Sequence, residues 1–175
     1  MRGRMHGCRW LGIAVASPAL SAMSAVIVGS GEVLASAGAA VLSVASPVSL
    51  PLEPVAGATG AVTPEACPRR LRIEVGELQI APGESVAVHA FVGEPDATAR
   101  TPLDDPGYVG SFTFFPVAGG RGPQRFVLAL DRLPSFERER LCSGDPPSVT
   151  LVLAPIAQGV PADQSQVKIQ GATLE

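Results

Sequence analysis

The feature that most restricts the fold is an alternation of apolar and polar residues with a period of two, which starts at Arg70. In the run Leu71 to Val75, apolar residues occupy every second position and charged residues lie between them. This spacing puts the apolar side chains on one face of an extended chain, so it predicts a half-buried β-strand. The following sequence, Ala81 to Glu84, contains Pro82 and Gly83, which favour a turn.

Similar runs recur through the rest of the chain, separated by proline- and glycine-rich segments. Residues 86–92 are apolar on both faces, which predicts a central strand covered on both sides. A short helix is expected at 134–141, where Ser135 can act as a cap. About seven short strands of this kind predict an all-β fold, an antiparallel β-sandwich with a jelly-roll-like arrangement. The other expected strands are residues 108–115, 126–130, 149–153 and 167–174.

The distribution of charge divides the chain into three parts. The first 62 residues contain only two acidic side chains, Glu32 and Glu53, and their arginines all fall within the first nine positions. From Ala66 onward, charged residues are frequent and of both signs. We therefore predict an apolar leader over residues 1–37, a flexible Ala/Ser/Pro/Val-rich linker over residues 38–66 and the sandwich domain over residues 67–175. The ordered part is expected to begin near Cys67.

The predicted leader has the layout of a secretory signal peptide. A short basic segment precedes an apolar run from Leu11 to Val28, and Ala35 to Ala37 are small residues that suit a signal peptidase. Cleavage there would give a secreted or periplasmic/extracellular protein. The alternative is a membrane anchor that stays uncleaved, because the apolar run is longer than a minimal signal core. Cys8 precedes the apolar run, whereas a lipid-attachment cysteine follows it, so a lipoprotein is excluded.

Two cysteines, Cys67 and Cys142, lie in the predicted domain. An even pair in an exported domain favours a disulfide bond. The alternative is a pair of free thiols. A metal-thiolate site would need further cysteine or histidine ligands, which the domain does not supply.

The charge balance argues against a nucleic-acid partner. Removing residues 1–37 takes away three arginines and one glutamate, which leaves 10 basic against 15 acidic residues and a net charge of −5. Nucleic acid requires a concentrated basic patch. The one close basic cluster in the domain consists of Arg69, Arg70 and Arg72.

No residue pattern indicates catalysis, a cofactor or a metal. His89 is the one histidine of the predicted domain, and a lone strand histidine is typically a packed or rim residue. A blue-copper site would need two histidines and a cysteine, and no Gly-x-Ser-x-Gly elbow is present for a serine nucleophile. The acidic segments Glu94 to Asp96 and Asp104 to Pro106 are read as solvated turns, with a calcium site as the alternative. We therefore expect a protein that is not an enzyme.

Five segments of this domain resemble a known family. The run Ala90 to Ala97 is followed by Thr101 to Pro106 and the aromatic strand Tyr108 to Phe115, and this order is similar to the C-terminal β-sandwich of tyrosinases and polyphenol oxidases. The ending, with Val149 to Pro155 and then Val167 to Glu175, is similar to the last strands of that domain. The resemblance covers roughly residues 70 to 175.

The resemblance implies a fold and a partner. In that family the sandwich is appended to a helical domain in which six histidines hold a type-3 dicopper site, and in some members the sandwich shields the copper. This chain has two histidines in all, so the resemblance argues against phenol oxidation by this chain itself. It implies a protein partner, a tyrosinase-like copper oxidase.

We therefore expect an exported, non-catalytic accessory domain that docks on or shields such an oxidase. One alternative is a structural or adhesive cell-surface sandwich unrelated to copper, and another is an enzyme or small-ligand binder whose site the sequence does not reveal. Phe115 is the candidate docking residue. Period two places it on the face opposite the expected core residues Phe112 and Phe114, and an exposed aromatic residue can concentrate binding energy.

Overall fold

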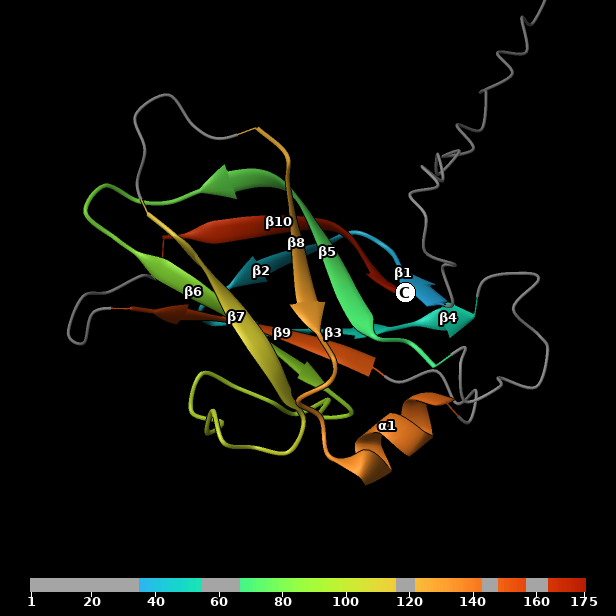
Figure 1. Cartoon of the computed structure of the whole chain (residues 1–175). Helices are drawn as coiled ribbons and strands as arrows, with labels where there is room; N and C mark the ends of the chain where they lie inside the picture. Colours follow the sequence, from blue (N-terminus) through green and yellow to red (C-terminus); the bar gives the residue numbers. More distant parts are fainter. Residues whose placement is uncertain (1–34, 55–66, 116–121, 143–147, 157–163) are drawn as a thin grey trace, which may run out of the picture.

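The computed structural model describes residues 35–54, 67–115, 122–142, 148–156 and 164–175. Within these ranges the chain forms two antiparallel β-sheets packed face to face, with one short helix (Figure 1). The predicted all-β sandwich is confirmed. The described residues contain ten strands where the sequence indicated about seven, and the additional ones come from the N-terminal part of the chain.

The larger sheet has six strands. Its hydrogen-bonded order is β4-β1-β10-β5-β8, and β2 pairs with β10 next to β1. The central pair, β10 and β5, is antiparallel, and its register shifts at two places between Val167 and Gly171 of β10. The strands of this sheet are β1 (Ala35–Ala37), β2 (Ala40–Ser43), β4 (Glu53–Pro54), β5 (Arg70–Gln79), β8 (Gln124–Ala129) and β10 (Gln166–Leu174).

The smaller sheet has the order β3-β9-β6-β7. Its strands are β3 (Val48–Pro51), β6 (Val86–Val92), β7 (Tyr108–Phe114) and β9 (Ser148–Pro155). The strand β6 lies between β9 and β7 and is buried on both faces, as its two-sided apolar pattern predicts.

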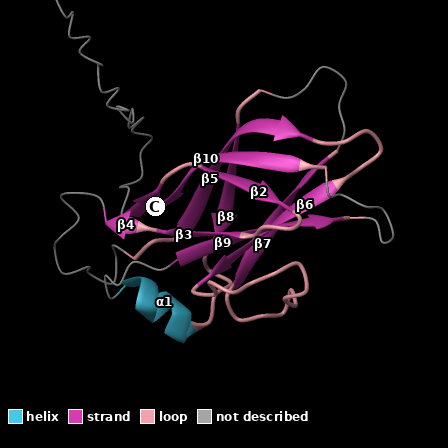
Figure 2. Cartoon of the chain, turned by 180° about the vertical axis from the view of Figure 1, so that it is seen from behind, coloured by secondary structure: helices cyan, strands magenta, loops and turns pink. Residues whose placement is uncertain are grey.

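The helix α1 (Ser135–Cys142) lies outside the two sheets, at one end of the sandwich (Figure 2). Three of its charged residues, Arg138, Glu139 and Arg140, are exposed, whereas Glu137 is buried. Its carboxylate pairs with Arg140 at 3.3 Å and packs against Gly93, where a Cβ atom would lie 3.3 Å from the Glu137 Oε2. Gly93 also has a positive φ of 77°, so this position favours glycine both for its conformation and for its space.

Side chains from the inner faces of both sheets form one main hydrophobic core. Phe112 and Phe114 of β7 are buried in it, as predicted. The ring of Phe112 stacks on Phe126 of β8 with the centroids 4.1 Å apart, and Phe114 meets Phe126 edge to face at 5.5 Å. These three rings join the two sheets across the β7–β8 side of the sandwich.

The predicted flexible linker over residues 38–66 is wrong for its first part. Strands β2 and β3 lie within it, and they add to the edges of β10 and β9 respectively. Leu42, Leu50 and Leu52 are buried in the core. The strands are only four residues long, too short to show a period in the sequence, and their stability comes from pairing with distant strands.

The domain boundary at Cys67 is therefore also wrong, because the sandwich already includes Ala35 to Pro54. The last three residues of the predicted leader form β1, which pairs with the end of β10. The rest of the leader, residues 1–34, and residues 55–66 of the linker lie outside the described residues.

The strand β7 contains a bulge that the alternation does not reveal. Its register against β6 shifts between Ala90 and Phe91, which pair with Gly110 and Tyr108. Val109 therefore joins the main core, while Tyr108 packs with Phe91 on the outer face. Strict period two over residues 108–115 would place Tyr108 on the face of Phe112 and Phe114, but the one extra residue reverses the alternation before it.

Candidate docking surface

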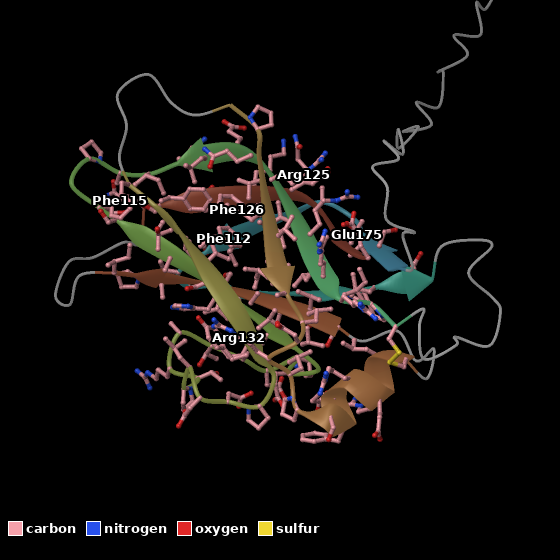
Figure 3. The ribbon with its side chains drawn as sticks, viewed as in Figure 1. Phe112, Phe115, Arg125, Phe126, Arg132 and Glu175 are labelled. Atoms are coloured by element: carbon pink, nitrogen blue, oxygen red, sulfur yellow. A yellow bond between two sulfur atoms is a disulfide. The ribbon has the colours of Figure 1, made fainter. Side chains whose placement is uncertain are left out.

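Phe115 directly follows β7 at one end of the four-stranded sheet, and 53% of its surface is exposed. Figure 3 shows its side chain apart from the stacked rings of Phe112 and Phe126. Val86 pairs with Phe114 on one side and with Pro155 on the other, so the next position along each strand brings Phe115, Ser85 and Ile156 into one row. The Ile156 N–H donates to the Ser85 carbonyl at 2.9 Å, and this hydrogen bond holds Ile156 beside Ser85.

We call Phe115, Ser85 and Ile156 the Phe115 row. Ile156 is 45% exposed, so the row presents two large apolar side chains separated by a serine. The neighbouring row consists of the small residues Ala87, Thr113 and Ala154. Sequence reasoning found Phe115 but missed Ile156, because their closeness depends on the pairing of β6 with both β7 and β9.

His89 lies farther along β6, on the outer face, with Ser111 and Val152 as its strand partners. Its ring meets Tyr108 edge to face with the centroids 6.1 Å apart, and its buried Nδ1 has no hydrogen-bond partner within the described residues. Burial lowers the pKa of His89 from 6.5 because it penalises the charged imidazolium. His89 is thus a packed residue of the sheet face, as the sequence predicted.

This lowered pKa leads to a pH-dependent stability. Between the lowered folded-state pKa and 6.5, the unfolded chain binds a proton that the folded chain does not, so stability falls as the pH drops through this window. We expect the melting temperature of the wild type to fall more than that of His89→Gln between about pH 7.5 and about pH 5.5. Thermal unfolding followed by circular dichroism measures both. Equal pH dependence in the two proteins would show that His89 is not responsible.

Cys67 and Cys142 form a disulfide bond, with their Cα atoms 4.9 Å apart. The bond joins the segment before β5 to the end of α1, and both sulfur atoms are occupied, so neither is a metal thiolate. An open cleft lies beside it between the start of β5 and α1. Its lining mixes both signs of charge: Arg69, Asp131, Arg138 and Glu139.

The acidic loop between β6 and β7 is built as a turn. The Asp105 carboxylate accepts the Gly107 N–H at 2.8 Å, and the Asp105 carbonyl accepts the Tyr108 N–H at 3.0 Å. Gly107 has no room for a side chain, since a Cβ atom would lie 2.6 Å from the Val92 carbonyl oxygen. Within the described ranges, no group of three His, Cys, Asp or Glu side chains is arranged to hold a metal ion.

Comparisons with known proteins do not assign a family. No family profile and no curated protein matches the sequence. Among solved structures, a recombinantly expressed latent aurone synthase, described as a polyphenol oxidase, is similar with 18% identity and a TM-score of 0.44, over 77% of this chain and 25% of that one. The same enzyme from its natural source gives 18% identity and a TM-score of 0.45, over 77% and 26%.

A different kind of protein is also similar. The Desmodium yellow mottle tymovirus structure has 14% identity and a TM-score of 0.32, over 90% of this chain and 94% of that one. The chain spans about a quarter of the length of the polyphenol oxidases it matches. With TM-scores below 0.5, these likenesses assign the chain to neither group.

Proposed function

We propose that this chain is an exported, non-catalytic accessory domain that docks on a type-3 copper oxidase through the Phe115 row. The observation that carries the docking site is the exposure of Phe115 and Ile156, on either side of Ser85 at one end of the smaller sheet. Aromatic residues supply a large share of the binding energy at protein interfaces. The kind of partner rests on the resemblance of residues 90–115 and 149–175 to the tyrosinase sandwich.

A copper partner would supply the chemistry that this chain lacks. A type-3 site uses six histidines, whereas the whole chain has two, so oxidation of a phenol would take place on the partner. The accessory domain would position itself beside the copper site and restrict access to it. The sandwich suits this role because β6 pairs with both β7 and β9. This pairing holds the ends of β7 and β9, where the Phe115 row lies, in a fixed arrangement.

Export is supported by the disulfide bond, since such bonds persist in oxidising compartments. The basic-then-apolar order of the predicted leader supports it independently. None of the helices that the structure describes is long and apolar enough to cross a membrane.

The docking proposal predicts different effects for two exposed phenylalanines. Phe115 and Phe136 are 53% and 52% exposed, but Phe136 lies on α1, away from the Phe115 row. We expect Phe115→Ala to weaken binding to a copper-loaded, tyrosinase-like protein without its own sandwich by about 1 kcal/mol or more, roughly fivefold in Kd. Phe136→Ala should leave the Kd unchanged. Titration calorimetry measures both.

Two outcomes would contradict the proposal. Equal losses for both variants would mean that the Phe115 row is not the docking site. The absence of any binding by the wild-type chain would reject the copper-oxidase partner, and recovery of the chain in membrane fractions would then favour a cell-surface role.

A stability control separates docking from folding. Phe112 is buried and stacked on Phe126, so Phe112→Ala should cost about 3–5 kcal/mol of unfolding free energy through the cavity it leaves. Phe115→Ala should leave the unfolding free energy nearly unchanged, because its ring is half exposed. Urea unfolding checks both, and similar losses would make Phe115 an ordinary core residue.

A further inference from the structure

The strand β8 forms an open edge of the larger sheet, since it pairs with β5 on one side and with no strand of the described chain on the other. The Leu130 N–H donates to the Arg69 carbonyl at 2.9 Å, which fixes the direction of the backbone groups along β8. Because hydrogen-bonded pairs alternate in an antiparallel ladder, Arg125, Val127 and Ala129 direct their N–H and C=O groups away from β5. No hydrogen bond within the described ranges uses these six groups.

The side chains of β8 are exposed on both faces. Val127 on the outer face is 52% exposed. Phe126 and Leu128 point into the sandwich but are only partly buried, whereas their strand partners Ile73 and Leu71 are fully buried. The difference arises because no strand of the described residues follows β8 in the sheet, so none of these residues covers its apolar side chains on that side.

The other edges of the two sheets carry features that discourage pairing. Edge strands are commonly protected by shortness, proline or a bulge. The strands β3 and β4 are short and end in Pro51 and Pro54, β2 has four residues, and β7 contains the bulge at Val109. In contrast, β8 has six residues in regular register, without proline.

We propose that β8 pairs antiparallel with β8 of a second copy of this chain, around a two-fold axis at Val127. In this register Val127 faces Val127 of the second copy, and Arg125 faces Ala129 in both directions. These three pairs use all six free backbone groups of each strand. A register shifted by two residues in either direction pairs only two of the three residues with each other, and a shift of one residue pairs none of them.

The side chains of β8 are complementary to themselves in this register. On the inner face, Phe126 of one copy lies opposite Leu128 of the other, so each covers a partly buried neighbour. On the outer face, Arg125 lies opposite the small, uncharged Ala129. Its guanidinium is already paired with Glu74 at 3.2 Å, so no like charges stand opposite each other. This pairing leaves the Phe115 row, on the other sheet, free for a partner.

Charge substitutions at Val127 test the proposal in the full chain. We expect the wild type to sediment as a dimer in analytical ultracentrifugation, and both Val127→Lys and Val127→Glu to sediment as monomers, because each places two like charges face to face. An equimolar mixture of the two variants should restore the dimer mass, since lysine then faces glutamate. Circular dichroism should show an intact sandwich in every case, because Val127 is half exposed.

The matched control is Val41→Lys on β2, where Val41 is 55% exposed but far from β8 in the order of the sheet. This variant should keep the wild-type mass. A wild type that stays monomeric at its highest soluble concentration would overturn the proposal. So would a Val127→Lys protein that keeps the wild-type mass, or loss of the dimer in Val41→Lys as well.

Discussion

A chain that begins at Cys67, the domain boundary expected from the sequence, should fail to fold. The truncation removes β1 to β4, and with them Leu42, Leu50 and Leu52 from the core. Burial of a leucine side chain contributes about 1.5–3 kcal/mol, so three of them match much of a typical domain's total stability. The deletion also strips β10 and β9 of their partners β2 and β3, which exposes two new sheet edges.

The control for this truncation is a chain that begins at Ala35, which keeps every described strand. Far-UV circular dichroism with thermal unfolding should show a cooperative β-sheet transition for this control and none for the shorter chain. Leu42→Ala gives a graded version of the same test and should cost about 2–5 kcal/mol. A cooperative transition at the same temperature in the chain that begins at Cys67 would show that β1 to β4 are dispensable.

Loss of the disulfide should have the second large effect. Cys67 and Cys142 are 75 residues apart, and closing a loop of that length stabilises the folded state by about 4 kcal/mol in the chain-entropy estimate. We expect the double variant Cys67→Ser, Cys142→Ser to unfold at a markedly lower urea concentration than the wild type. The variant loses stability because the bond holds the end of α1 against the segment before β5.

Two controls define the role of this bond. Cys8→Ser should leave the unfolding free energy unchanged, because Cys8 is outside the bond. A reducing agent should lower the stability of the wild type to that of the double variant. If the oxidised wild type and the double variant unfold at the same urea concentration, the bond contributes nothing to stability.

The alternation of residues determined the type of fold and several core positions. In Leu71 to Val75 and in Val86 to Val92, period two identifies strands and their inward faces directly, because neighbouring side chains on a strand point to opposite sides. Phe112 and Phe114 were placed in the core for the same reason. The disulfide bond could also be predicted from the sequence, because only two cysteines lie in the folded part.

Local pattern did not reveal the features that depend on pairing between distant strands. The segments Ala40–Ser43 and Val48–Pro51 are strands because β10 and β9 offer them open edges, and four residues are too few to show this in the sequence. The bulge at Val109 reverses the face of Tyr108 through its register with β6.

The residues of the candidate surfaces were likewise predictable from the sequence only in part. Phe115 could be placed outside the core from the alternation in its own strand, and the structure finds it half exposed. Its neighbour Ile156 and the free edge of β8 follow only from the order of strands in the two sheets. Outside the bulge at Val109, the side a residue faces is set by its own strand, whereas its lateral neighbours are set by hydrogen bonds to segments many residues away. The sequence alone therefore determined an antiparallel sandwich and the inner and outer residues of its regular strands after Arg70. The tertiary structure decided the bulge, the short N-terminal strands and which outer residues share a surface.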